Sequence, residues 1–114
     1  MNEENMQVIM NLIIHSGNAK SDAMEAIQAA KNADFELAKE KIETAQSSLV
    51  EAHHSQTSLL TEESRGNHME ITLLAVHSQD HLMTSIAFTD LAKEIIELYQ
   101  LNEVKITQPV TPVK

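Results

Sequence analysis

Cysteine is absent from this 114-residue chain, and glycine, proline and aromatic residues are rare. Without cysteine the protein has neither disulfide bonds nor thiolate chemistry, which fits a reducing compartment. The chain contains two glycines, two prolines, two phenylalanines, one tyrosine and no tryptophan. Strands draw on aromatic residues, and the turns between them draw on glycine and proline. The composition therefore predicts an all-α fold.

Basic residues are also scarce, with eight against 17 acidic residues and a formal net charge of −9. A nucleic-acid surface needs clustered lysine and arginine, so we expect no nucleic-acid partner. The same charge disfavours direct binding to an anionic membrane. No apolar run approaches the ~20 residues of a membrane-spanning helix, and the first residues do not resemble a signal peptide. We expect a cytoplasmic protein.

Three long segments carry apolar residues at intervals of three and four, the spacing of amphipathic helices. The predicted helices span about residues 3–31, 34–62 and 69–101. Short connections between three such rods favour an up-down-up antiparallel bundle. We expect this bundle to form one domain over residues 1–104. A flexible tail, residues 105–114, contains both prolines.

Local signals mark the ends and the connections of these helices. Asp34 is the expected N-cap of the second helix. Gly17, inside the first helix, indicates close packing or a slight bend. The other glycine lies in the segment Thr61–His68, which we predict to be the second connection and the more mobile one.

The third helix is apolar around much of its circumference, so one partner surface would not cover it. A chain this short builds only a modest core, and association with further copies would help it. One stripe along this helix contains Met69, Leu73, Val76, Asp80, Met83, Ala87, Leu91, Ile95 and Leu98. A second stripe contains Leu74, His77, His81, Thr84 and Phe88.

Three polar residues, His77, Asp80 and His81, interrupt these stripes. At ~100° per residue, the two histidines lie on one face of the helix and Asp80 points about 60° to one side of His77. No lysine or arginine lies within one helical turn of Asp80. A buried Asp80 would therefore need a proton, a cation from another helix or a metal ion.

The spacing alone leaves three interpretations of this cluster open. The histidines can be partly exposed, with Asp80 in solvent or in an ordinary salt bridge. Histidines four residues apart with a nearby carboxylate can also bind zinc or another divalent ion. In the third interpretation, a neutral imidazole attacks a phosphoryl donor, and Ser78, Gln79 or His81 orients the ring or receives the charge.

The remaining histidines are weaker candidates for the same site. His15 can approach it from the first helix. His53 and His54 are consecutive on the second helix and point in different directions, so at most one of them can face a given site. His68 lies beside the predicted loop and is expected to be solvated.

The segment VHSQDHLMTS (Val76–Ser85) resembles the VHAQDHLMT signature of a known family. This family comprises the lactose/cellobiose-type (and chitobiose-type) enzyme IIA components of the phosphoenolpyruvate-dependent sugar phosphotransferase system. The segment from LIIHSGNAKS to SQTSLL (Leu12–Leu60) is similar to the first two helices of the family. AKEIIELY (Ala92–Tyr99) is similar to its usual ending. The similarity extends from about Val8 to Leu101.

The resemblance implies a homotrimer with a nine-helix core, which would cover the apolar third helix. It implies that His77 is phosphorylated and that Gln79 and His81 orient or stabilise the phosphohistidine. Asp80 falls on the aspartate that gathers with its copies on the trimer axis and shares a divalent cation. Oxygen-only ligation suits Mg²⁺, Mn²⁺ or Ca²⁺ better than zinc, with Mg²⁺ the first choice. Ser78 replaces the usual alanine and is expected to add a hydroxyl beside the nucleophile.

The function that the resemblance implies is that of a phosphocarrier. HPr would phosphorylate His77, and the cognate enzyme IIB would accept the group for the uptake and phosphorylation of a disaccharide. Membrane contact would be indirect, through enzyme IIC. Because His77 lies in mid-helix, side chains must stabilise the phosphoryl charge in place of the helix dipole.

Three competing functions are compatible with a helical bundle that contains histidines. A histidine phosphotransfer domain also carries a phosphorylated histidine, but it usually has lysine where this chain has Asp80. A non-catalytic helical adaptor would leave the histidines without a chemical role. A metal-binding bundle would use them as ligands.

Overall fold

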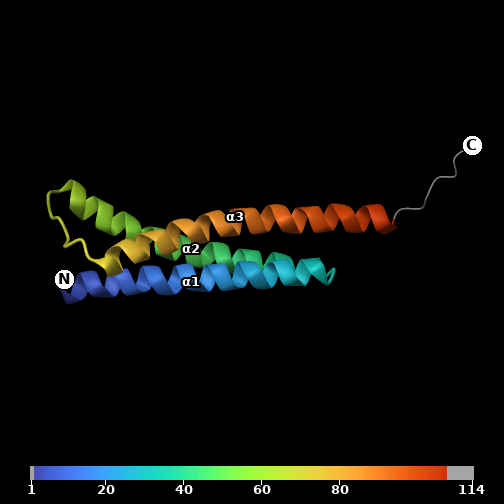
Figure 1. The fold of residues 1–114 in the computed structure, drawn as a ribbon, viewed down its shortest axis with the longest axis horizontal. Coiled ribbons are helices and arrows are strands. Elements are labelled where there is room, and N and C mark those ends of the chain that lie inside the picture. Colours follow the sequence, from blue (N-terminus) through green and yellow to red (C-terminus); the bar gives the residue numbers. More distant parts are fainter. Residues whose placement is uncertain (1, 108–114) are drawn as a thin grey trace, which may run out of the picture.

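Three long helices form the protein: α1 (Glu3–Lys31), α2 (Phe35–Ser64) and α3 (Leu73–Thr107). They run up, down and up (Figure 1). The computed structural model describes the backbone of residues 2–107 and the side chains of residues 2–104, and no strand occurs in that part of the chain. The all-α, antiparallel architecture predicted for the single chain is confirmed.

Side-chain caps fix the beginnings of α1 and α2. Asn2 Oδ1 accepts a hydrogen bond from Asn5 N at 2.7 Å, and Asp34 Oδ1 accepts one from Leu37 N at 3.2 Å. Each bond satisfies a backbone N–H group that has no partner inside its helix. The predicted cap at Asp34 is confirmed.

α3 begins later than the sequence pattern predicted. Thr72 Oγ1 accepts a hydrogen bond from Ala75 N at 3.1 Å, which makes Thr72 the N-cap. The helix therefore starts at Leu73, four residues after the start predicted at about residue 69, and that prediction is wrong. The apolar spacing of Met69 continued the helical pattern into the loop, and the capping threonine overrides it.

α3 also ends later than predicted. It continues to Thr107, because residues 102–107 contain neither glycine nor proline to stop it. The first three residues of the predicted tail are thus helical. The rest of that tail, residues 108–114, lies outside the described residues.

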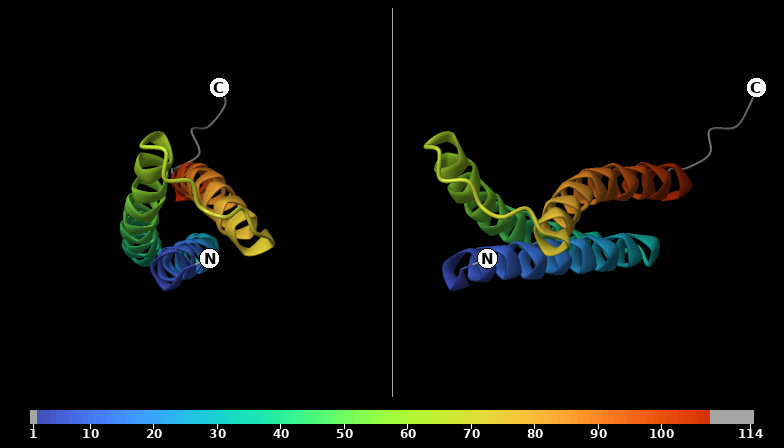
Figure 2. Two further views of the ribbon diagram at one scale, coloured as in Figure 1. Left: turned by 90° about the vertical axis from the view of Figure 1, so that its left-hand side faces the viewer. Right: turned by 60° about the vertical axis from the view of Figure 1, so that its left-hand side comes forward.

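The hydrophobic core divides into two clusters along the bundle. Near the α1–α2 turn it consists largely of alanines, together with Ile42 and Ile96. Alanine has a short side chain, so helices that meet through it can pack closely. Toward the N-terminal end of α1, the core uses the larger side chains of Ile9, Leu12 and Leu82. At that end α2 and α3 separate, and a loop bridges the gap (Figure 2).

Side-chain contacts tie this loop to the end of α2. Glu62 accepts hydrogen bonds from Arg65 at 3.0 Å and from Asn67 at 2.9 Å, and His68 Nδ1 lies 2.6 Å from Glu63 Oε1. The bond from Asn67, followed by that from Arg65, holds the pKa of the Glu62 carboxyl below its usual value. His68 is exposed, as expected. The greater mobility of this connection stays a prediction.

Candidate active site

The candidate site is built around two stacked histidine rings on α3. His77 and His81 are one turn apart on the same helical face, and their ring centroids are 5.5 Å apart with an interplanar angle of 23°. His77 is exposed, whereas His81 is partly buried. The outer ring is thus accessible to another molecule, while the inner ring supports it.

α1 approaches His81 closely at a glycine. A Cβ atom added to Gly17 would lie 3.4 Å from His81 Nε2, at the short limit of ordinary van der Waals contact. A larger side chain there would displace the imidazole. The close packing predicted for Gly17 is confirmed, and the ring that it admits belongs to the candidate site.

One helical turn further along, a lysine joins the same two helices. Lys20 Nζ on α1 donates a hydrogen bond to Thr84 Oγ1 on α3 at 3.2 Å. Thr84 Oγ1 in turn donates to the carbonyl oxygen of His81 at 3.3 Å. Lys20 also lines a groove of about 600 Å³ that includes Gly17, His81 and Phe88. A positive charge therefore borders the histidine pair.

The surroundings of His81 favour its neutral form. Burial lowers the pKa of His81 below the usual histidine value of 6.5, and the positive charge of Lys20 and the neighbouring His77 lower this pKa further. At neutral pH, His81 is thus an uncharged neighbour that can donate or accept a hydrogen bond through a ring nitrogen.

Gln79 points toward a different helix. Its Oε1 atom accepts a hydrogen bond from Gln56 Nε2 on α2 at 2.8 Å. Residues two apart are about 200° apart around a helix, so within one chain Gln79 and His77 face opposite sides of α3. Gln56 was not among the residues singled out from the sequence, and only the packing of α2 on α3 reveals its contact with Gln79.

Asp80 is exposed on a third side of α3. Among residues 2–104, no group of three or more histidine, cysteine, aspartate or glutamate side chains is placed to hold a metal ion. The single chain therefore supplies one carboxylate and no complete metal site. The exposed apolar neighbours of Asp80 on the same side of α3 are Leu73, Val76, Met83, Leu91, Leu98 and Leu101.

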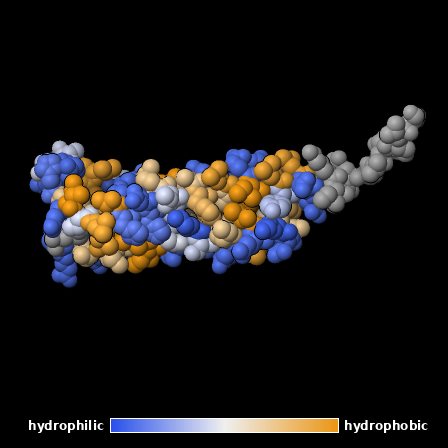
Figure 3. All heavy atoms as spheres, in the orientation of Figure 1, coloured by the Kyte–Doolittle hydropathy of each residue, from blue (hydrophilic) through white to orange (hydrophobic). Residues whose placement is uncertain are grey.

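These residues and Asp80 are called the outer face of α3 below. Figure 3 shows hydrophobic patches among hydrophilic residues on the side of the molecule that is in view. No helix within residues 2–107 is both long and apolar enough to traverse a bilayer. The exposed leucines of the outer face therefore do not belong to a membrane-spanning segment of the described chain.

The hydroxyl of Ser78 does not lie beside the His77 ring as expected. Its hydroxyl is fully buried and donates a hydrogen bond to the carbonyl oxygen of Ala75 at 2.6 Å. Ser78 follows His77 directly, so the two side chains point about 100° apart around the helix. The substitution of serine for alanine thus alters the core and leaves the surroundings of the exposed ring unchanged.

The other histidines lie on other parts of the surface. His15 is two residues before Gly17, the residue of α1 that meets His81, so it lies on a different side of α1. His53 and His54 are both exposed on α2. None of the three is among the residues that line the groove beside His81.

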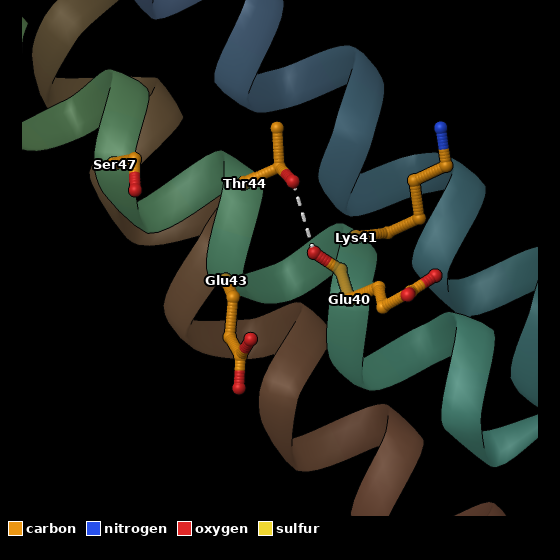
Figure 4. Close-up of a pocket in the computed structure, with 5 residues that line it drawn as sticks. All are labelled: Glu40, Lys41, Glu43, Thr44 and Ser47. Carbon is orange, nitrogen blue, oxygen red and sulfur yellow. Dashed lines mark hydrogen bonds between the residues drawn. The ribbon is translucent and has the colours of Figure 1, made fainter.

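A second surface hollow offers no comparable chemistry. It is lined by Glu40, Lys41, Glu43, Thr44 and Ser47, all of them on α2, and their side chains point in different directions (Figure 4). The hydroxyl of Thr44 donates to the carbonyl oxygen of Glu40 at 3.0 Å, and Lys41 is paired with Glu25 at 2.8 Å. Two of its polar side chains, Thr44 and Lys41, are thus engaged in local contacts, and its lining contains no histidine.

These observations define a class of protein first: a three-helix chain that presents an accessible histidine, supported by a second one, on its longest helix. The family model "PTS system, Lactose/Cellobiose specific IIA subunit" matches residues 7–100. The chain belongs to this family. It is an enzyme IIA phosphocarrier of the lactose/cellobiose/chitobiose type, a phosphotransferase component of the sugar phosphotransferase system.

Relatives match nearly the whole chain. It is 51% identical over 108 residues to the lichenan-specific phosphotransferase enzyme IIA component of Bacillus subtilis, covering 95% of this chain and 94% of the relative. The crystal structure of the cellobiose-specific enzyme IIA of Bacillus anthracis has a TM-score of 0.89 and 45% identity, covering 92% and 96% of the two chains. The IIA(chitobiose)–HPr complex of the Escherichia coli phosphotransferase system has a TM-score of 0.77 and 40% identity, covering 90% and 99%. This membership decides against the histidine phosphotransfer domain and the adaptor.

Proposed function

We propose that His77 accepts a phosphoryl group from HPr and passes it to the cognate enzyme IIB. The observation that carries this proposal is the exposed ring of His77, stacked on His81 inside the signature segment. The similar chitobiose-type chain of Escherichia coli was solved in complex with HPr, which supports HPr as the donor. Enzyme IIB as acceptor, and the disaccharide that it serves, follow from the family.

Transfer to His77 is a nucleophilic displacement at phosphorus. A neutral imidazole nitrogen attacks, and the new nitrogen–phosphorus bond forms as the bond between phosphorus and the donor breaks. The reverse process delivers the group to enzyme IIB. Protonation of His77 removes the attacking lone pair, so acid should slow the reaction. His81 holds the ring in place without adding a second positive charge.

The proposed role of Gln79 involves a neighbouring copy of the chain. Because Gln79 faces away from His77 on its own helix and contacts Gln56, it can stabilise a phosphohistidine only on another subunit. This requirement agrees with the proposed homotrimer, in which three α3 helices meet and the outer face of each is covered. The exposed leucines of that face supply the apolar surface for the association.

Asp80 fits a shared divalent cation in such a trimer. Three carboxylates that meet at the centre of an apolar interface would repel one another unless they are protonated or bridged by a cation. Carboxylate oxygens suit Mg²⁺, Mn²⁺ or Ca²⁺. The ion would neutralise the three charges and stabilise the assembly, and the transfer chemistry would remain with the histidine.

Phosphorylation of the purified chain tests the proposal. Incubation with phosphoenolpyruvate, enzyme I and HPr should place an acid-labile, base-stable phosphate on His77, located by mass spectrometry of peptides. His77→Ala should abolish the label. His54→Ala, which changes an exposed histidine on α2, is the matched control and should leave it intact. Labelling of His77→Ala at the wild-type level would refute the assignment.

A further inference from the structure

Lys20 is a positive charge without a negative partner beside the histidine pair. Among residues 2–104 it forms no ion pair, although the chain has 17 acidic residues; its hydrogen bond goes to the neutral hydroxyl of Thr84 at 3.2 Å. Two other cationic side chains of the described structure do pair with carboxylates. Lys41 pairs with Glu25 at 2.8 Å, and Arg65 pairs with Glu62 at 3.0 Å.

The pairing of Lys41 also matters for the groove beside His81. Glu25 lines the same groove as Lys20, and it is the only carboxylate among the lining residues in the described structure. Because Lys41 binds Glu25, this carboxylate is already neutralised and does not compete for Lys20. The groove therefore contains one uncompensated cation.

The fold places this cation on the side of α3 that carries the histidine pair. Lys20 lies one turn beyond Gly17 on α1, and Thr84 lies one turn beyond His81 on α3. Because the two helices run in the same direction, the Lys20–Thr84 contact lies one turn along the bundle from the Gly17–His81 contact. His77 and Thr84 are about 10.5 Å apart along the helix axis, at 1.5 Å per residue. A lysine carries its charge on a flexible four-carbon stem, so the ammonium group can leave Thr84 and turn toward a phosphoryl group that extends from the His77 ring.

A phosphoryl group on His77 needs such a charge. It brings close to two negative charges at neutral pH to a protein whose formal net charge is −9. Asp80 is three residues away, and the middle of a helix supplies no dipole charge.

We propose that Lys20 binds the phosphoryl group carried by His77, releasing Thr84 to do so. This inference rests on the proposed function of His77. The neutral hydrogen bond to Thr84 holds the ammonium group ready in the free protein, and a charge-assisted bond to a phosphoryl oxygen replaces it in the phosphorylated state. The same contact stabilises the charge that develops during transfer.

The rate of phosphoryl transfer from phospho-HPr to the full chain tests this role. Lys20→Met should lower kcat about tenfold with little change in KM, because it removes one charged contact made by the transferring group. Lys20→Arg should restore most of the rate. Lys93→Met is the matched control: it removes the same charge from the groove between α2 and the C-terminal half of α3, and it should behave as the wild type.

A phosphorus NMR titration of the phosphorylated protein provides a readout that a fold defect would not imitate. A nearby cation lowers the pKa of a phosphoryl group, so this pKa should rise in Lys20→Met and stay unchanged in Lys93→Met. An unchanged phosphoryl pKa in Lys20→Met would overturn the proposal. An effect of Lys20→Met on KM alone would also overturn it, and would make Lys20 a docking residue for HPr.

A different result would show that the proposed function of His77 is wrong. If the wild type and Lys93→Met acquire no phosphate on His77, both proposals are wrong. If both acquire it and Lys20→Met acquires it at the same rate with the same phosphoryl pKa, only the role of Lys20 is wrong.

Discussion

The face of α3 that packs against α1 and α2 carries Ser78, Ser85 and Thr89, which are at most 1% exposed, whereas the outer face carries Leu73 and Leu98, which are 86% and 65% exposed. A lone helix bundle normally has the reverse arrangement, with large apolar residues inside and hydroxyls outside. Small inner residues allow the three helices of one chain to pack closely. Large apolar outer residues are then available for other copies of the chain.

The difference between the two faces explains why Asp80 lies where it does. On the inner face a lone carboxylate would be buried without a partner. On the outer face it is exposed in the single chain, and the proposed trimer would enclose it. In the proposed trimer, the position of Asp80 would therefore couple its charge to assembly, while His77, which is exposed in the single chain, would remain open to a partner protein.

A charge placed on the outer face should have the largest effect on assembly. Leu98→Glu introduces a carboxylate where the proposed trimer buries a leucine, and three such charges would meet in one interface. We expect the trimer to dissociate to monomers at micromolar concentration in sedimentation equilibrium. Val50→Glu, at an exposed position on α2, is the control and should remain trimeric. A trimeric Leu98→Glu protein would show that the outer face is not the interface.

Replacing Asp80 by an apolar residue tests whether its charge is needed for assembly and for metal binding. Asp80→Leu should keep or strengthen the trimer, because a buried charge is exchanged for a side chain that matches the rest of the outer face. It should also abolish the binding of Mg²⁺ or Mn²⁺ in isothermal titration calorimetry. A monomeric Asp80→Leu protein in sedimentation would contradict this account of the interface.

Removal of divalent ions provides the complementary test. Chelation of the wild type should loosen the trimer and lower its thermal stability, because the carboxylates then repel one another. The same treatment of Asp80→Leu should change little. Equal melting temperatures for the wild type with and without chelator would argue against a shared ion.

A substitution on the face of α3 that packs against α1 and α2 should stabilise the folded chain modestly. The hydroxyls of Ser16, Ser85 and Thr89 are buried and have no hydrogen-bond partner in the described part of the chain. Thr89→Val keeps the shape and removes an unsatisfied group, so it should raise the free energy of unfolding by about 1 kcal/mol. Thr44→Val, at an exposed site, should change it little. A destabilised Thr89→Val protein in urea denaturation would show that the hydroxyl has a partner in solution.

The smallest expected effect is a shift in the titration of His81. Burial, Lys20 and His77 lower the pKa of His81 below 6.5, so this residue should become protonated at a lower pH than an ordinary histidine. Lys20→Met should raise that pKa part of the way, because burial, the largest cause, remains. Proton NMR titration would reveal it, with Lys93→Met as the control. A His81 pKa that is insensitive to Lys20 would place the ammonium group elsewhere.

The sequence predicted the three helices because their apolar periodicity is long and regular. The roles of Asp34 and Gly17 could be predicted from residue type alone. Aspartate is a typical helix cap, and glycine permits the close approach of a neighbouring helix. The start of α3 was wrong because Met69 fits the apolar period, although Thr72 is itself a typical capping residue. A search for capping side chains inside apolar stripes would have corrected it.

The site was only partly readable from the sequence. Spacing placed His77 and His81 on one face, but it did not choose between solvated residues, a metal site and a nucleophile. The family signature favoured the nucleophile. The contacts of Lys20 with Thr84 and of Gln56 with Gln79 depend on the register between helices, and the periodicity of each separate helix carries no information about that register.

The central claim is that His77 both accepts and surrenders a phosphoryl group, and a single-turnover chase tests it most directly. The chain is labelled with radioactive phosphate through HPr, purified, and mixed with the cognate enzyme IIB in the absence of phosphoenolpyruvate. We predict that the label leaves His77 and appears on enzyme IIB with the same time course. Label that stays on the chain, or departs only as free phosphate, would contradict the assignment of His77 as the carrier residue.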